Sequence, residues 1–406
     1  MEYNLTPEQA LFRDTTRGFL EKEAPLSKVR ELAAGPVGFD PAWWRRGAEL
    51  GWASMLVAPA MGGDSISGNG IADMAIVAEE MGKLVSPGPL VPVNVVALAL
   101  SEAANAKDHA EVIEQLMSGA AIASWAVYEP GRGWDLDGIA VTAARDGDDY
   151  LLAGTKDRVD SGDQADYLLV TARLPDVDRG GSGGSSPRAS TAVDRGGLVG
   201  SSPRASTGLA QFLVPVTAPG VTVTRDQSLD LVRRFATVRL EGVRVSSSGL
   251  VGAPGEGAAA AARQLQAAVA LQCAELTGAA GRVLEFTVQW AFDRYSFGRP
   301  LASYQALKHR FADMRLWLEA SQAVAGAAAR AAAAGGPEAA ELTSVAKAYI
   351  GERATDIIQD CVQLHGGIGV TWEHDIHLYL RRATVDRALW GTPSEHRRLL
   401  ADILNV

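Results

Sequence analysis

The spacing of hydrophobic and polar positions changes twice along the chain. In the first segment, apolar residues such as Ile71 and Met74 recur at helical intervals. Thr6 followed by Pro7 has the residue types of a helix N-cap and first turn. These patterns predict an N-terminal α-helical domain over residues 1–120.

Beyond this segment, short runs of β-branched and aromatic residues alternate with polar ones, as in half-buried strands. The runs are Tyr150–Leu152, Tyr167–Thr171, Gln211–Val216, Val221–Thr224 and Thr237–Val245. Glycine and aspartate separate them. The pattern predicts an antiparallel β-sheet domain over residues 121–245.

Helical spacing then returns. Leu307 and Phe311 begin an apolar series that continues into a long Ala-rich stretch and ends near Gly335. A second helix is expected over Ala346–Leu364. We therefore predict a C-terminal helical-bundle domain over residues 246–406, and an α+β fold class with the domain order α, β, α.

A tandem duplication interrupts the β-domain. Residues 176–191 and 192–207 match at 13 of 16 positions and are rich in Gly, Ser and Arg. Such a segment has little apolar surface to bury, so we expect a disordered surface loop over 176–207, between two strands. A basic handle or partner tether is the alternative interpretation.

The amino-acid composition excludes some classes of protein. Apolar residues make up 47% and charged residues 21%, as in soluble globular proteins. The 38 basic and 48 acidic residues give a net charge of −10, which argues against a nucleic-acid-binding protein. The N-terminus has no signal-peptide pattern, and Leu90–Leu100 is too short to span a bilayer, so we expect a cytoplasmic protein.

No metal site is predicted. Cys273 and Cys361 are isolated in apolar sequence, with no CxxC pattern. His374 and His377 lie three residues apart, but no third ligand accompanies them, which favours a helix-surface role.

Two segments of the C-terminal half carry candidate chemistry. One reads Arg-Tyr-Ser-Phe-Gly-Arg-Pro-Leu and is soon followed by Gln305; the other reads Gln-Leu-His-Gly-Gly-Ile-Gly. An arginine can clamp a phosphate with its planar fork, and glycine lets the backbone approach a ligand closely. The candidate binding residues are Arg294, Phe297, Gln305, Gln363, Gly366 and Gly367.

Together these segments resemble the acyl-CoA dehydrogenase family, which carries RxxFGxPL…Q and QxxGGxG in this order. Tyr128-Glu129-Pro130-Gly131 resembles the TEPxxGSD segment of that family, and Leu389-Trp390-Gly391-Thr392 stands where the family usually has YEGT. The resemblance covers nearly the whole chain. It implies the family fold, with a helical domain, a β-domain and a four-helix bundle.

The resemblance also implies an activity and a cofactor. Family members bind FAD at a subunit interface, usually in tetramers, and use a Glu base to start α,β-dehydrogenation of an acyl-CoA thioester. An electron-transfer flavoprotein reoxidises the flavin. On this basis Tyr128, Ser161 and Thr392 join the expected cofactor-binding residues.

The sequence departs from the family pattern at the expected base. Trp390 replaces the glutamate of YEGT and cannot accept a proton. The position on an earlier helix that carries the base in some family members falls on Ala268. Glu275, two helical turns later on the same face, is the remaining candidate.

A second departure lies in the β-domain. The KxWxT(N/S)G pattern, whose Trp and Thr contact flavin in the family, has Arg158 and Asp160 in these positions. A carboxylate there would disfavour a reduced, anionic flavin. The chain's own flavin half-site therefore departs from the pattern, whereas the half that it would lend to a neighbour matches it.

Three hypotheses follow. The chain is an FAD-dependent acyl-CoA dehydrogenase of fatty acid or steroid breakdown, alone as a homotetramer or as a subunit of a heterotetramer with a homologous subunit. Alternatively, it is a non-catalytic scaffold subunit that completes a partner's FAD site. A third hypothesis is a flavin oxidase on the same fold, since fold does not fix function.

Overall fold

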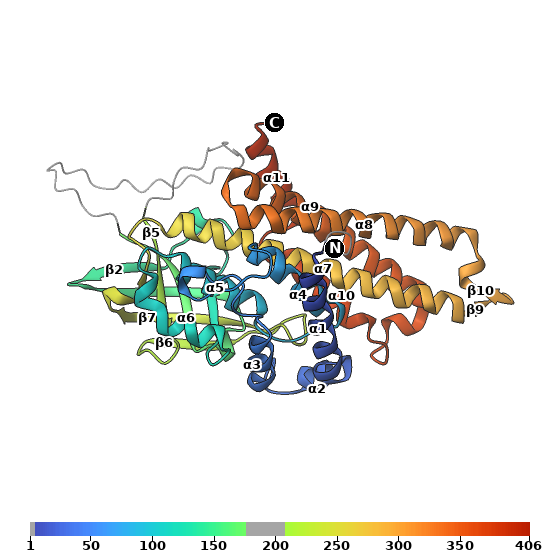
Figure 1. Cartoon of the computed structure of the whole chain (residues 1–406), viewed down its shortest axis with the longest axis horizontal. Coiled ribbons are helices and arrows are strands. Elements are labelled where there is room, and N and C mark those ends of the chain that lie inside the picture. Colours follow the sequence, from blue (N-terminus) through green and yellow to red (C-terminus); the bar gives the residue numbers. More distant parts are fainter. Residues whose placement is uncertain (1–4, 176–207) are drawn as a thin grey trace, which may run out of the picture.

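The computed structural model describes residues 5–175 and 208–406. Three regions follow one another along the chain: helices, a β-sheet, and a long helical bundle (Figure 1). This order agrees with the α+β fold predicted from the sequence. The duplicated segment 176–207 lies outside the described residues, between two strands of the sheet.

From residue 5 onward, where the structure describes it, the N-terminal region contains six α-helices besides short 3₁₀ turns. They are α1 (Pro7–Glu23), α2 (Leu26–Ala34), α3 (Pro41–Glu49), α4 (Gly70–Lys83), α5 (Leu90–Glu102) and α6 (Ala110–Met117). The predicted cap of α1 is confirmed: Thr6 Oγ1 accepts the Gln9 backbone N–H at 3.2 Å, and the Gln9 side chain bonds back to the Thr6 N–H.

The apolar run over Leu90–Leu100 forms α5, which is buried within the protein. Helix α5 packs against the first strand of the sheet, so its apolar character serves the core. Among the helices of the described residues, none combines the length and apolar character needed to cross a membrane.

The described part of the central sheet contains eight strands. They are β1 (Ala123–Ala126), β2 (Thr142–Asp146), β3 (Asp149–Asp160), β4 (Tyr167–Arg173), β5 (Leu209–Pro215), β6 (Val221–Arg225), β7 (Phe235–Val245) and β8 (Leu250–Val251). Their order is β6-β7-β3-β2-β4-β5-β8, with β1 beside β4. All five predicted strands are confirmed.

The strand directions differ from the prediction of a purely antiparallel sheet. Strands β1 and β2 run parallel to β4, while the other pairings are antiparallel. Side-chain alternation is the same in either direction, so the residue pattern alone cannot distinguish them.

The C-terminal region is a bundle of long helices. It contains α7 (Gly257–Asp293), α8 (Gln305–Ala334), α9 (Gly336–His365), α10 (Ile376–Ala388) and α11 (Pro393–Leu404), with a small hairpin of β9 (Tyr295–Ser296) and β10 (Arg299–Pro300). Helix α8 ends before Gly335 as predicted. Helix α9 begins ten residues earlier than expected, because Gly335 turns the chain at φ +73° and Pro337 starts the next helix.

Helices α4 and α7 touch through their backbones at two glycines. A Cβ on Gly82 would lie 1.9 Å from the Glu275 carbonyl oxygen, and one on Gly278 would lie 2.0 Å from the Glu79 carbonyl oxygen. This close approach fixes α7 against the N-terminal region. It also sets the position of the Glu275 side chain in the interior between the three regions.

We predict that Gly278→Ala lowers the free energy of unfolding by about 1–3 kcal/mol, because the added methyl group forces the two helix backbones apart. Denaturant unfolding would measure the change. Gly281→Ala is the matched control on α7, since its Cβ would meet only Leu318 methyl groups at 3.7–3.8 Å. The control should be neutral or stabilising. Equal effects of the two substitutions would contradict the close helix contact.

Candidate functional site

The first group of candidate residues lies at one end of the helical bundle. Arg294 follows α7 and is exposed, and Phe297 in the small hairpin is 98% exposed. Gln363 is exposed on the last turn of α9. The Trp290 and His365 rings stack 5.2 Å apart, and the Arg294 guanidinium lies 6.0 Å from the Trp290 ring centre. The structure therefore brings the two sequence segments together.

The backbone at this end is open. Gly366 has φ +63°, and a Cβ on Gly366 or Gly367 would meet nothing within 4 Å among the described residues. Gln305, the first residue of α8, is exposed as well. Arg294 forms no ion pair with any residue that the structure describes, so its charge is available to another molecule. A cationic fork beside accessible backbone fits the anionic part of a dinucleotide.

This bundle end cannot serve the chain's own sheet. Figure 1 shows β9 and β10 at the end of α7 and α8 that points away from β2 and β5. Among the other candidate residues, Tyr128 and Ser161 follow strands β1 and β3, and Thr392 begins α11, two residues after Trp390, whose backbone N–H bonds to Tyr128. The structure thus separates the predicted cofactor-binding residues into two groups.

The polar groups of the second set are occupied within the chain. The Tyr128 hydroxyl accepts the Trp390 backbone N–H at 2.6 Å, and Ser161 donates to Asp160 at 3.0 Å. Thr392 forms a capping box with Glu395 at the start of α11. Burial raises the pKa of Tyr128, so this phenol stays neutral.

The Trp390 indole closes the space between the sheet and the bundle. Its ring stacks on Trp125 at 5.3 Å and on Tyr128 at 5.2 Å, with interplanar angles of 20° and 30°. Only 5% of Trp390 is exposed. The side chain that the sequence motif predicts at the base position therefore lies inside an aromatic stack.

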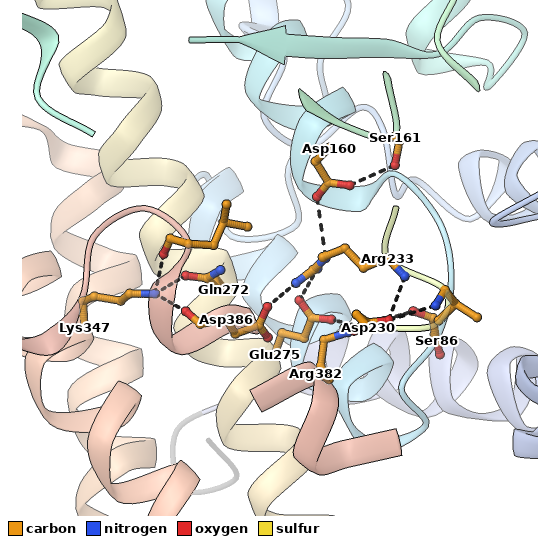
Figure 2. A network of polar contacts seen from close by, with 12 residues as sticks. Ser86, Asp160, Ser161, Asp230, Arg233, Gln272, Glu275, Lys347, Arg382 and Asp386 are labelled. Atoms are coloured by element: carbon orange, nitrogen blue, oxygen red, sulfur yellow. Dashed lines mark hydrogen bonds and ion pairs between the residues drawn. The ribbon is translucent and has the colours of Figure 1, made fainter. Parts of the chain in front are cut away.

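A cluster of buried charges fills the adjoining interior (Figure 2). Its centre is two arginines from different segments, Arg233 between β6 and β7 and Arg382 on α10. They pair with carboxylates from β3, the β6–β7 loop, α7 and α10, which are Asp160, Asp230, Glu275 and Asp386. We call these six residues the charged cluster.

Glu275 is held as an anion in this cluster. Its carboxylate accepts from Arg233 at 2.6 Å and from Arg382, and only 4% of the residue is exposed. Burial alone would raise the pKa of Glu275, but the two guanidinium groups hold it below its usual range. A carboxylate clamped in this way is a weak base, which argues against Glu275 as the proton acceptor.

Asp160 is also turned into the cluster. Its carboxylate lies 3.6 Å from Arg233, and burial raises its pKa more than Arg233 lowers it. The neighbouring Arg158 points elsewhere and donates to the carbonyls of Glu129 and Arg132. Both departures from the family pattern are thus built into contacts within the chain.

Sequence reasoning missed Lys347, which holds the turn before Trp390. Its ammonium donates to the carbonyl of Leu389 at 2.6 Å, to the carbonyl of Asp386 and to Gln272. Burial lowers its pKa to about 8. One signal was present: Lys347 shares a helical face with the apolar Ile350, three residues on, and the structure buries both.

The two histidines His374 and His377 take part in aromatic contacts. The His374 ring lies 4.5 Å from His365, and the His377 ring stacks on Trp372 at 4.6 Å. In the described part of the chain, no group of three or more His, Cys, Asp or Glu could hold a metal ion.

Two hollows beside the sheet and the charged cluster are too small for a flavin ring. The hollow next to Tyr128 and Trp134 and the hollow next to Ser86, Arg233 and Arg382 each have a volume of about 10 Å³. Ligand sites typically need about 300 Å³ or more. The aromatic stack and the charged cluster occupy the space, whereas the exposed bundle end fits an anionic ligand.

We predict that Arg382→Met lowers the free energy of unfolding by about 3–5 kcal/mol, because Glu275 and Asp230 would keep their charges without this partner. Chemical denaturation would measure the loss. Arg387→Met on the same helix is the control, because Arg387 is exposed and has no ion pair within the described residues. If both variants unfold at the wild-type denaturant concentration, the cluster does not stabilise the fold.

Comparisons with known proteins agree with this architecture. Residues 6–120 match the acyl-CoA dehydrogenase N-terminal domain, and residues 255–404 match the C-terminal domain. The chain is 30% identical over 399 residues to acyl-CoA dehydrogenase IpdE2 of Mycobacterium tuberculosis, covering 98% of each chain.

Solved structures give the same result. A putative acyl-CoA dehydrogenase from Mycobacterium smegmatis has a TM-score of 0.83 at 26% identity, covering 99% of this chain and 98% of that one. A variant of the Tcur3481-Tcur3483 steroid ACAD has a TM-score of 0.81 at 27% identity, covering 98% of both. The chain therefore belongs to the acyl-CoA dehydrogenase family of FAD-dependent oxidoreductases.

Proposed function

We propose that this chain is the site-completing subunit of a heteromeric acyl-CoA dehydrogenase. A homologous partner subunit holds the flavin ring and the catalytic carboxylate. This chain contributes its exposed bundle end to the partner's FAD. The observation that carries the proposal is the Trp390 stack, because this buried ring stands at the sequence position that the resemblance assigns to the catalytic base.

The proposed dehydrogenation requires a catalytic carboxylate from the partner subunit. Removal of a weakly acidic proton next to a thioester carbonyl needs a free carboxylate near the substrate. Trp390 cannot supply one, and Glu275 is clamped between Arg233 and Arg382. A self-sufficient dehydrogenase and a flavin oxidase both need the ring in this cleft, so neither agrees with the closed interior.

The bundle end has a defined task in this assembly. Arg294 would pair with the FAD pyrophosphate, and the glycine backbone at Gly366 and Gly367 would lie against the same group. Gln363 and Gln305 would add polar contacts. FAD, when bound, supplies the hydride acceptor for the α,β-dehydrogenation; an electron-transfer flavoprotein then accepts the electrons.

The substrate class is an acyl-CoA thioester. The similarity to a protein named as a steroid ACAD supports the inclusion of steroid-derived acyl groups beside fatty acyl groups. The paired name of that protein also supports a two-component enzyme for this chain.

The central test is the flavin content of this chain purified alone and after co-expression with a neighbouring homologous acyl-CoA dehydrogenase. We expect a colourless protein alone and one FAD for each pair of chains in the complex, read from the visible absorbance. A yellow protein with one FAD per chain, purified alone, would refute the proposal.

The same complex tests Arg294. Arg294→Ala should weaken FAD retention roughly ten- to hundredfold, since a charge-assisted hydrogen bond contributes about 1.5–3 kcal/mol. Arg282→Ala is the control on α7, the helix that Arg294 follows, because Arg282 pairs with Glu285 at 2.6 Å. Unchanged retention in the Arg294 variant would remove this residue from the site.

A second prediction distinguishes two reasons why this chain would lack an active centre of its own: the absence of a catalytic base, or the absence of space for the flavin ring. In the complex, Trp390→Glu should create no second active centre, because Asp160 and Arg233 still fill the adjoining interior. We expect unchanged turnover per complex and unchanged flavin content, with Trp372→Glu at an exposed position as the control. A doubling of both quantities would show that only the base was missing.

A further inference from the structure

The charged cluster contains more negative than positive groups (Figure 2). Its four carboxylates and two guanidinium groups have a formal charge of −2. Lys347, which is also buried, binds the backbone carbonyl of Asp386 and adds one positive charge. One negative charge then remains without a counterpart in the interior, where such a charge is strongly unfavourable. A bound proton would neutralise it.

Two of the four carboxylates are fully engaged as anions. Glu275 accepts from both arginines of the cluster. One oxygen of Asp230 accepts two backbone N–H groups, from Val232 at 2.9 Å and from Arg233 at 2.8 Å, and the other oxygen accepts from an arginine side chain. Burial alone would raise the pKa of Glu275 and Asp230, but the arginines hold both below the usual range. Neither group is therefore the site of a proton at neutral pH.

Asp160 and Asp386 are the less completely paired carboxylates. Asp160 accepts from the Ser161 hydroxyl at 3.0 Å, and its second oxygen lies 3.6 Å from Arg233. Asp386 pairs with Arg233 through one oxygen, whereas its Oδ2 has no hydrogen-bond partner among the described residues. The Asp386 side chain is fully buried, so water cannot replace the missing donor. A buried oxygen in this state favours the neutral, protonated carboxyl.

We infer that Asp386 carries a proton on Oδ2 up to neutral pH, and that its release at higher pH places one uncompensated negative charge beside the turn that leads to Trp390. The group that binds is a proton, so the charged cluster is a pH-sensitive device within the packed interior. The inference concerns the folded chain itself and does not depend on the proposed role with a partner subunit.

The charged and titratable groups that face Asp386 come from the β6–β7 loop, α7, α9 and α10 itself; they are Arg233, Glu275, Cys273, Lys347 and Arg382. Burial raises the pKa of Asp386 to about 7, an effect that the cations oppose and Glu275 increases. Burial also raises the pKa of the Cys273 thiol to about 12, so Cys273 adds no charge. The surroundings thus agree with the assignment from the hydrogen bonds.

The proton couples folding to pH in a defined window. In an unfolded chain, an aspartate has a pKa of about 3.9. Because the pKa of Asp386 is raised on folding, the folded chain binds one more proton than the unfolded chain between about pH 4 and pH 7. The stability that this proton contributes is fully present below about pH 4 and is lost as the pH rises to about 7.

Asp386→Asn isolates this proton, because asparagine has a similar shape and never carries the charge. We expect the ratio of the unfolding equilibrium constants, wild type over variant, to rise up to about tenfold per pH unit between about pH 5 and pH 7, and to level off above it. Denaturant unfolding of the full chain at several pH values would measure the ratio. The slope is diagnostic, since loss of the ion pair with Arg233 changes the ratio by a similar factor at every pH.

Asp402→Asn is the matched control, because Asp402 is an exposed aspartate on α11. Its ratio should stay constant over the same pH range. A flat ratio for Asp386→Asn would overturn the inference. So would an equal slope for the two variants, because the coupled proton would then not belong to the buried carboxyl.

Infrared spectroscopy tests the proton in the wild-type chain, even if Asp386→Asn does not fold. A protonated carboxyl has a C=O stretching band that ionised carboxylates lack. We expect this band at about pH 6, where exposed carboxyls are ionised, and its loss at about pH 9. Asp160→Asn should keep the band. A folded wild-type chain without the band at about pH 6, or loss of the band in Asp160→Asn, would overturn the assignment to Asp386.

Discussion

Two buried arginines, Arg233 and Arg382, join the regions of this protein through carboxylates that have left water. Their partners come from the sheet, the loop beside it and two helices of the bundle, and Arg382 also lies near the carbonyl of Ser86 from the N-terminal region. Removing charges from water is costly, so each group must meet its counterpart. That requirement fixes the relative positions of the segments, and the hollow beside Arg233 and Arg382 has a volume of only about 10 Å³.

The aromatic stack closes the rest of the cleft by a different force. Trp390 buries a large apolar ring, and dispersion with Trp125 and Tyr128 adds to the area removed from water. Lys347 secures the turn by donating hydrogen bonds to the carbonyls of Asp386 and Leu389 at the end of α10, where the last carbonyls lack partners within the helix. Charge pairing and stacking thus act on adjacent parts of one interior.

The end of the helical bundle is exposed, in contrast to the packed interior. Arg294, Gln363 and the Gly366 backbone remain at the surface. An oligomeric enzyme that shares a cofactor between subunits needs this arrangement, since one surface must stay open for the neighbour. Closed interior and open end together favour a division of labour between two homologous chains.

The sequence by itself determined the order of helices and strands, because periodicity and capping are local: Thr6 and Gly335 mark helix limits where the structure has them. It also determined the motif segments around Arg294 and Gly366 and the absence of a carboxylate at Trp390. The sequence did not determine the directions of strands β1 and β2, because side chains alternate in the same way in parallel and antiparallel strands. Only the tertiary structure decided the partners of Glu275 and Asp160, because Arg233 and Arg382 meet them across long sequence distances that no local pattern encodes.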